Sequence, residues 1–269
     1  MAFVAAADET YGRCLHQFLL SAERLGLDAR HPFVVGDLGL APARRTGLER
    51  RFPWCRFERF PFEDYPPHVA VKVMNYAWKP LLLGQVAARF PRLLYLDSAT
   101  LLRRSPAEVE AWLDRQGVYS LAGQCPLRER CDPRTAAAFG ASPELLARRE
   151  QVATLVGFDT RHPVAARVLA RWGELALRPE IILARHPGHI VDQALLSLLL
   201  LDAAQRGELV LEAGDVDISS GTPVTWMSTR NKVPAWLPAW TDPAVRAWYA
   251  VTKAADQWNH RRLNAASGR

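Results

Sequence analysis

Short apolar runs alternate along the chain with longer stretches in which apolar side chains recur every three or four residues. Apolar runs bounded by turn-forming residues predict strands, and the three-to-four spacing predicts amphipathic helices. Strands separated by helices predict an α/β fold with a mainly parallel central sheet and helices on both faces. The expected strands are residues 3–7, 32–37, 55–60, 92–97, 118–122, 151–157 and 209–212, and the expected helices are 15–25, 80–88, 105–115, 163–177 and 190–205.

Three of the expected strands end on an aspartate: Asp8, Asp37 and Asp97. In open α/β sheets, ligands bind beyond the carboxyl ends of the strands, where loops and helix starts converge. The three carboxylates are therefore candidates for one binding edge. For Asp8 and Asp37 the alternative is that each caps the turn or helix that follows it. Asp97 is the stronger candidate, because it emerges from a strand expected to be buried in the centre of the sheet.

Several motifs that would indicate other chemistry are absent. No G-x-G-x-x-G follows the first expected strand, and neither G-x-x-x-x-G-K-S/T nor G-x-S-x-G occurs anywhere in the sequence. The sequence therefore does not indicate a dinucleotide site, a P-loop or an α/β-hydrolase site.

The 269-residue chain has 34 basic and 28 acidic residues, a formal net charge of +6. All but four of the basic residues are arginines, spread along the chain, whereas a nucleic-acid binder more usually concentrates mixed lysine and arginine in one stripe. Residues 230–269 contain seven basic and two acidic side chains, so most of the excess lies there. Nucleic acid is therefore not an expected partner.

The four cysteines contain no C-x-x-C pair, which argues against a zinc ribbon or a thioredoxin-like site. Cys125 and Cys131 flank a polar loop, and a disulfide between them is the alternative to unpaired thiols. The N-terminus lacks the pattern of a signal peptide, and the apolar run at 194–204 is too short to cross a bilayer. We expect a cytoplasmic protein, either free or at the inner membrane face.

The segment 75–99 places Trp78-Lys79-Pro80 before an expected helix and ends an apolar strand with Asp97-Ser98-Ala99. It resembles the donor-site region of GT-A fold glycosyltransferases, in which an Asp-x-Asp motif ends a central strand. The resemblance implies a Rossmann-like transferase domain over residues 1–240 and a nucleotide diphosphate sugar as donor. It also implies Mn²⁺ or Mg²⁺ as a cofactor, because a cation held by carboxylates offsets the diphosphate charge.

The same resemblance assigns residues to the donor. It implies that Asp97 and Ser98 lie at the phosphates or metal and that Lys79 contacts a phosphate or the ribose. For Lys79 the alternative is a solvated lysine at a helix start.

Further motifs extend the resemblance. Asp37-Leu-Gly-Leu40 and Tyr65-Pro-Pro-His68, together with the Trp-Lys-Pro and Leu-Asp-Ser motifs, are similar to a poorly characterised glycosyltransferase-like family. The similarity implies that Asp8, Tyr11 and Asp37 form the nucleobase pocket, with Tyr11 stacking on the base and Asp37 accepting a base N–H.

Two later segments are similar to elements around the reacting centre. His189-Ile-Val-Asp192-Gln193 resembles the Asp-Gln helix start of retaining transferases, which implies that Asp192 and Gln193 are catalytic and face the anomeric carbon. The segment 228–236 resembles a basic loop that closes over the diphosphate, which implies that Arg230 and Lys232 bind it. The alternative for Asp192 is a carboxylate that merely favours a helix N-terminus.

Ala99 departs from the family pattern, because it replaces the second aspartate of Asp-x-Asp and cannot ligate a metal. Three interpretations remain open. Asp97 and a histidine, His186 or His189, could hold the cation together with water and the diphosphate. Arg230 and Lys232 could instead neutralise the diphosphate without a metal. The third interpretation is a protein that has lost catalysis and only binds nucleotide or glycan.

The sequence pattern of residues 241–269 predicts a separate C-terminal helix that is basic and rich in tryptophan. This helix either packs on the domain or rests on anionic lipid at a membrane face. Taken together, the resemblance implies a glycosyltransferase of polysaccharide biosynthesis that moves a sugar to a glycan or lipid-linked acceptor. The alternative is a catalytically inactive binding protein on the same fold.

Overall fold

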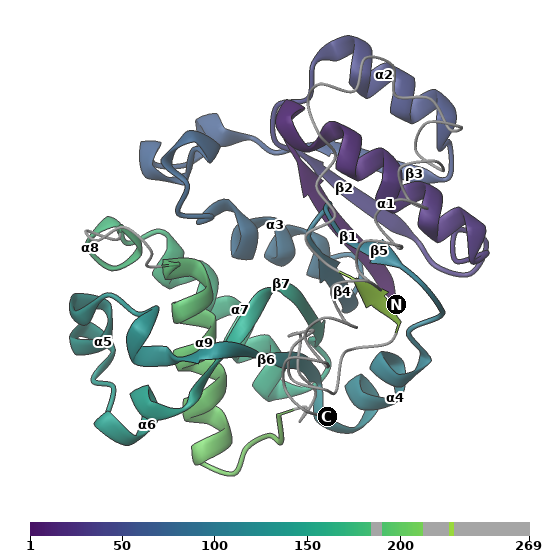
Figure 1. Cartoon of the computed structure of the whole chain (residues 1–269). Coiled ribbons are helices and arrows are strands. Elements are labelled where there is room, and N and C mark those ends of the chain that lie inside the picture. Colours follow the sequence, from purple (N-terminus) through teal and green to yellow (C-terminus); the bar gives the residue numbers. More distant parts are fainter. Residues whose placement is uncertain (184–189, 212–225, 229–269) are drawn as a thin grey trace, which may run out of the picture. The chain divides into compact units, whose positions relative to one another are not determined.

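A computed structural model of the chain describes residues 1–183, 190–211 and 226–228. Its main sheet has six strands in the order β3-β2-β1-β4-β7-β6 (Figure 1). β1 pairs parallel with β4, whereas β7 runs antiparallel to both of its neighbours, β4 and β6. The sheet is therefore mixed and mainly parallel, which confirms the predicted fold class. The strands are β1 (Ala2–Ala7), β2 (Phe33–Asp37), β3 (Cys55–Arg59), β4 (Arg92–Leu96), β6 (Val118–Pro126) and β7 (Arg149–Asp159).

The chain divides into two compact units. Among the described residues, the first unit comprises 1–4, 59–96, 107–183 and 190–211, and the second comprises 5–58, 97–106 and 226–228. The second unit contains a further two-stranded antiparallel sheet of β5 (Leu101–Leu102) and β8 (Met227–Ser228). Its helices are α1 (Gly12–Arg24) and α2 (Pro42–Arg51), and those of the first unit are α3 (Trp78–Ala87), α4 (Ala107–Gln116), α5 (Pro133–Phe139), α6 (Pro143–Ala147), α7 (Pro163–Ala176), α8 (Pro179–Ile182) and α9 (Val191–Gln205).

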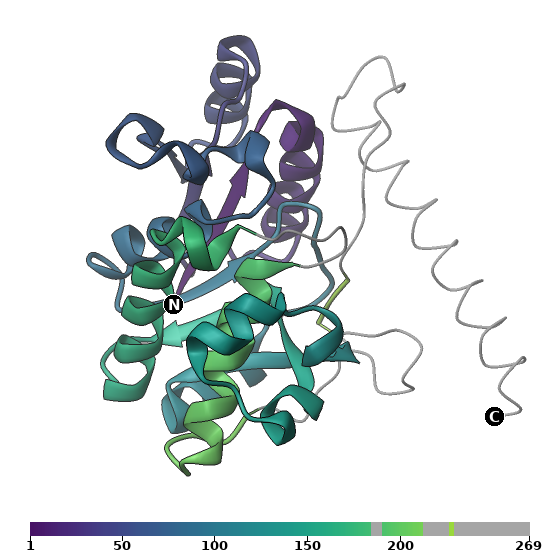
Figure 2. The same cartoon turned by 90° about the vertical axis from the view of Figure 1, so that its left-hand side faces the viewer.

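Helices of the first unit surround β7, the longest strand of the sheet. α9 packs against β7 and α7, and α7 also packs against α3 (Figures 1 and 2). α4 packs against β6 and β7. Most side chains of β7 and α9 are buried, and most of them are apolar. The polar residues inside these two elements are therefore held in a nearly water-free interior.

The sequence predicted most of these elements to within a few residues, but the expected strand at 209–212 is wrong. Residues 209–211 have no regular structure. α9 is followed by Gly207 at a φ of 72°, and the N–H of Val210 donates to the side chain of Gln116 instead of to a strand. The four cysteines, including Cys125 and Cys131, are free thiols.

Some predictions fall outside the described residues. They concern the C-terminal helix at 241–269 and the candidate residues His186, His189, Arg230 and Lys232. Among the helices that the structure does describe, none has the length and apolar character needed to span a membrane.

Candidate active site

In the second unit, the loops that follow β1 and β2 lie side by side. The N–H of Leu38 donates to the carbonyl of Ala7 over 3.0 Å, and the N–H of Glu9 donates to that of Gly39 over 3.2 Å. These bonds bring together the loops that carry Asp8 and Asp37. The shared strand edge that the sequence predicted for these two aspartates is therefore present.

Asp37 is buried, and its carboxylate holds its own loop in place. Its Oδ1 accepts from the N–H groups of Gly39, over 2.9 Å, and of Leu40, over 2.7 Å. Its Oδ2 accepts from Arg45 Nη1 over 3.0 Å. Gly39 has a φ of 122°, a conformation that strongly favours glycine. The contact between Asp37 and a nucleobase remains a prediction, but its carboxylate clearly shapes the loop.

Asp8 takes the capping role that the sequence offered as an alternative. Its Oδ1 accepts from the N–H of Tyr11 over 3.1 Å, which caps the 3₁₀ turn Glu9–Tyr11. Tyr11, at the start of α1, is half-buried. Glu9, which sequence reasoning missed, accepts from Arg44 over 2.7 Å and from the N–H of Ala41 over 3.0 Å. This loop is therefore fixed from both sides.

Asp97 follows β4 and opens a tight turn in which its carbonyl accepts from the N–H of Thr100 over 2.9 Å. Asp97 is half-buried, whereas Ser98 and Ala99 are buried. The described residues contain no group of three or more histidine, cysteine, aspartate or glutamate side chains that could hold a metal ion. Asp97 alone does not form a cation site, and His189 lies outside these residues. The described ligand set thus does not fit a bound metal by itself.

In the first unit, Lys79 and Asp192 form a buried ion pair. Lys79 stands in the first turn of α3 and is 4% exposed, and Asp192 stands in the first turn of α9 and is 1% exposed. Lys79 Nζ lies 3.3 Å from Asp192 Oδ2 and donates to the carbonyl of Ala153 over 3.1 Å. Two residues that the sequence assigned to different parts of one site are therefore in direct contact. The interpretation of Lys79 as a solvated lysine is wrong.

Aromatic rings surround the Lys79 ammonium group. The ring centroids of Tyr95, Tyr76 and Trp78 lie 5.1, 5.4 and 5.9 Å from Nζ. Each is within the range at which a ring face attracts a cation. The positive charge is thus stabilised by Asp192, by a carbonyl and by aromatic rings in place of water.

The turn before α3 holds Tyr76 in an unfavourable backbone conformation. Met74 and Tyr76 have φ values of 59° and 56°, in the left-handed region that costs a non-glycine residue free energy. Asn75 holds this turn, because its Nδ2 donates to the carbonyl of His68 over 2.8 Å and its Oδ1 accepts from the N–H of Ala77 over 3.0 Å. Strain of this kind is concentrated at functional sites. The result here is a fixed position for Tyr76 beside Lys79.

Gln193, next to Asp192, is held at both ends of its amide. Its Oε1 accepts from the N–H of Ala153 over 3.1 Å, and its Nε2 donates to Glu150 Oε2 over 2.6 Å. The carbonyl of Ala153 binds Lys79, so this one residue of β7 contacts both side chains. Lys79, Asp192, Gln193 and Glu150 are hereafter called the buried polar cluster.

Glu150 is the member of the cluster that the sequence did not reveal. It is 4% exposed, and burial raises its pKa, although the hydrogen bond from Gln193 and the charge of Arg130 act in the opposite direction. Arg130 Nε lies 3.9 Å from Glu150 Oε1. In the sequence Glu150 follows two arginines and resembles an ordinary surface charge. It lies inside because both α9 and β6 pack against this part of β7.

Comparison with known proteins identifies the fold. No family model matches the chain, and no curated protein sequence matches it. Among solved structures, the galactosyltransferase LgtC, in complex with donor and acceptor sugar analogues, superposes with a TM-score of 0.58 and 17% identity over 94% of this chain and 96% of its own. The chain has the fold of GT-A glycosyltransferases.

Two further GT-A structures give the same result. A glutamine-to-glutamate active-site mutant of LgtC has a TM-score of 0.51 at 18% identity, with 94% of this chain and 96% of the mutant covered. The mannosyltransferase Ktr4p from S. cerevisiae has a TM-score of 0.53 at 7% identity, with 74% of this chain and 65% of Ktr4p covered. These structures support the same fold class as the comparison with LgtC.

Proposed function

We propose that this GT-A protein is a glycosyltransferase that moves a sugar from a nucleotide diphosphate sugar to a glycan or lipid-linked acceptor. The observation that carries the proposal is the buried polar cluster, in which Lys79, Asp192 and Gln193 meet inside a fold shared with sugar transferases. Charges are costly to bury, and strongly desolvated charge pairs are found more often at functional sites than elsewhere. Support also comes from LgtC, which was solved with donor and acceptor sugar analogues.

The proposal gives each candidate residue a role. Asp8, Tyr11 and Asp37 form the pocket for the base, while Asp97, Ser98, Lys79, Arg230 and Lys232 neutralise or hold the diphosphate. Asp192 and Gln193 line the reacting centre. The carboxylate of Asp192, which pairs with Lys79, favours the positive charge that develops at the anomeric carbon in an oxocarbenium-like transition state. LgtC also has an active-site glutamine, which supports the role given to Gln193.

In this proposal, Asp97 and His189 are the residues that would hold a divalent cation. Mn²⁺ or Mg²⁺, when bound, would offset the charge of the departing diphosphate. Because the described residues do not complete a ligand set, no step assigned to the chain depends on the metal. Donor binding measured with and without Mn²⁺ tests this part separately.

Donor hydrolysis by the full chain tests the proposed activity. Nucleotide diphosphate sugars with different bases and sugars are supplied with Mn²⁺, and release of the nucleotide is followed. We expect Asp97→Ala to lower turnover of the accepted donor about 100-fold, as does loss of a group that stabilises transition-state charge. Asp64→Ala, which removes an exposed carboxylate from the turn Phe62–Asp64, is the matched control and leaves turnover unchanged. Equal turnover of Asp97→Ala and wild type would contradict the site assignment.

A second function is favoured by Ala99, whose methyl group takes the place of a metal-binding carboxylate. On this alternative the protein binds a nucleotide sugar or glycan without turnover. It predicts saturable nucleotide binding that Asp97→Ala weakens, together with no donor hydrolysis under any condition. Hydrolysis of one donor at a rate that depends on Asp97 rejects it.

The proposed acceptor and cellular setting rest on the basic, tryptophan-rich segment at 241–269. A cytoplasmic protein at the inner membrane face would meet a lipid-linked acceptor there. Co-sedimentation with anionic vesicles, compared with neutral vesicles, tests this setting. Equal binding to both kinds of vesicle, or to neither, would contradict it.

A further inference from the structure

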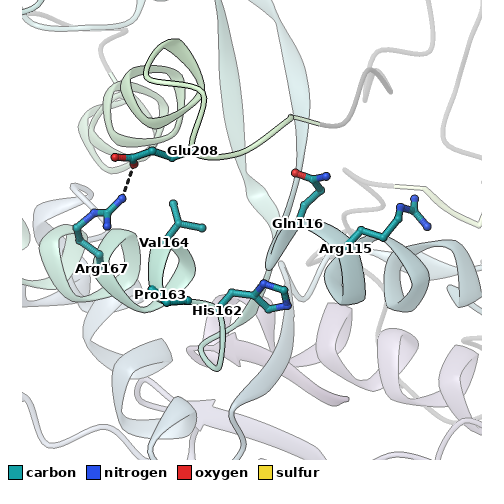
Figure 3. Close-up of a pocket in the computed structure, with 7 residues that line it drawn as sticks. All are labelled: Arg115, Gln116, His162, Pro163, Val164, Arg167 and Glu208. Carbon is teal, nitrogen blue, oxygen red and sulfur yellow. Dashed lines mark hydrogen bonds and ion pairs between the residues drawn. The ribbon is translucent and has the colours of Figure 1, made fainter.

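A pocket with a volume of about 350 Å³ lies in the first unit, apart from the buried polar cluster (Figure 3). Its volume falls within the range of small-molecule sites. Residues from three places line it: the end of α4, the start of α7 and the segment after α9. They are Arg115, Gln116, His162, Pro163, Val164, Arg167 and Glu208.

The pocket lies at the opposite end of β7 from the buried polar cluster. Glu150 and Ala153 belong to the first part of β7, whereas His162 follows Asp159, the last residue of this strand. An extended strand rises about 3.3 Å per residue, so the stretch from Ala153 to Asp159 alone separates the two places by roughly 20 Å. A ligand in this pocket would therefore bind at a site distinct from the proposed reacting centre.

Gly117 lets His162 approach the turn between α4 and β6. Gly117 has a φ of 73°, and a Cβ atom at this position would lie 2.5 Å from the Cβ of His162. The turn is further fixed by the N–H of Asp159, which donates to the carbonyl of Gly117 over 2.7 Å. One wall of the pocket is thus formed by a close contact that any larger residue at position 117 would disturb.

The lining is rich in hydrogen-bond donors and carries a net positive charge. Among the described residues Arg115 has no ion-pair partner, and its guanidinium lies 5.3 Å from the ring centroid of Trp112. Arg167 pairs with Glu208, the single acidic side chain of the lining, and Glu208 also pairs with Arg206.

Neutral side chains supply further hydrogen-bond donors to the pocket. The side-chain oxygen of Gln116 accepts from the N–H of Val210 over 2.8 Å, which leaves its NH₂ group as a donor. His162 precedes α7 without capping it through its side chain. Figure 3 shows Gln116 and His162 between the two arginines.

We propose that this pocket binds a small phosphorylated molecule. Guanidinium groups match the oxygens of a phosphate group, and charge-assisted hydrogen bonds are about twice as strong as neutral ones. Pro163 and Val164 supply an apolar wall for the carbon part of the ligand. The proposal does not depend on the glycosyltransferase function, because none of these residues belongs to the candidate active site.

Calorimetric titration of the full chain with inorganic phosphate, with glycerol 3-phosphate and with acetate as a control anion tests the proposal, with sodium chloride keeping the ionic strength constant. Arg167→Gln and Arg115→Gln are the test variants. Arg171→Gln is the matched control, because Arg171 stands one turn further along α7, is 49% exposed against 53% for Arg167, and also pairs with a glutamate, Glu174. Thermal unfolding of each variant checks that it is folded.

We expect saturable binding of glycerol 3-phosphate that each test variant weakens about tenfold and that Arg171→Gln leaves unchanged. Phosphate should also slow amide hydrogen exchange in peptides that cover residues 107–117 and 160–170. Three results would overturn the proposal: no saturation by either probe, an equal loss of affinity in Arg171→Gln, or acetate binding as tightly as phosphate.

Discussion

Lys79 Nζ lies 3.3 Å from Asp192 Oδ2, and both side chains are almost completely removed from solvent. The pair joins the first turns of α3 and α9, two helices that are distant in sequence. Neither charge can be lost alone without leaving its partner buried and uncompensated. Both the stability of the first unit and the electrostatics of the proposed site therefore depend on this contact.

The first prediction concerns the free energy of unfolding. Lys79→Met should destabilise the chain by about 3–5 kcal/mol, because it leaves the carboxylate of Asp192 buried without its positively charged partner. The double variant Lys79→Met with Asp192→Leu should lose less than the sum of the two single variants. Urea unfolding of the four proteins measures the coupling. Breaking the exposed pair of Arg59 and Glu63 with Arg59→Met should cost less than about 1 kcal/mol. Additive losses for Lys79 and Asp192 would show that the buried contact is absent.

The burial of Glu150 should make the free energy of unfolding depend on pH. Burial raises its pKa above the ordinary value of 4.5, so the folded state holds the proton more strongly than the unfolded state. The stabilisation from this group is complete below about pH 4.5 and is lost as the pH rises through the raised pKa.

Glu150→Gln removes this titration and keeps an oxygen to accept from Gln193. The unfolding free energy of wild type should therefore fall relative to that of Glu150→Gln as the pH rises from about 4.5 to neutrality. Urea unfolding of both proteins at a series of pH values measures the difference. A difference that stays constant, or that changes in favour of wild type, would contradict the burial of Glu150.

Asp159 should make the free energy of unfolding change with pH in the direction opposite to that expected for Glu150. Burial alone would raise its pKa, but hydrogen bonds from Arg161 and Arg92 outweigh burial and hold the pKa well below its usual value of 3.8. The stabilisation is therefore present above about pH 3.8 and is lost in more acidic solution.

Asp159→Asn should cost about 2–3 kcal/mol at neutral pH and should flatten this acid dependence. Asp114 pairs with the same Arg92 but is 61% exposed, so Asp114→Asn should cost less than about 1 kcal/mol. Denaturant unfolding at neutral and acidic pH compares the two variants. If Asp114→Asn proved as costly as Asp159→Asn, the buried position of Asp159 would not be the cause.

Comparing Gly117→Ala with Gly140→Ala measures the steric cost of adding a methyl group at position 117. Their φ values are 73° and 72°, but a Cβ at position 117 meets His162, whereas a Cβ at position 140 meets nothing within 4 Å. Gly140→Ala should lose about 1 kcal/mol through backbone strain alone. Gly117→Ala should lose about 1–3 kcal/mol more, because neighbouring groups must move. Equal melting temperatures for the two variants would show that His162 does not approach the turn.

Local sequence patterns predicted the local features of this fold. Apolar runs bounded by turn residues marked β1, β2 and β4, and Asp8 caps a turn as aspartate often does. The antiparallel direction of β7 was not predicted, because periodicity carries no information about strand direction. Glu150 looked like a surface charge, and Asn75 gave no sign that it clamps a strained turn. Their roles come from contacts between distant segments, as does the pairing of Lys79 with Asp192.

The most direct test of the central claim, that this chain binds a nucleotide diphosphate donor at Asp97, is calorimetric titration of the full chain with UDP, GDP, ADP, CDP and dTDP in the presence of Mn²⁺. We predict saturable one-to-one binding of one of these nucleotides, weakened about tenfold or more by Asp97→Ala and unchanged by Asp64→Ala. Absence of binding to every nucleoside diphosphate would contradict both the transferase and the nucleotide-binding alternative.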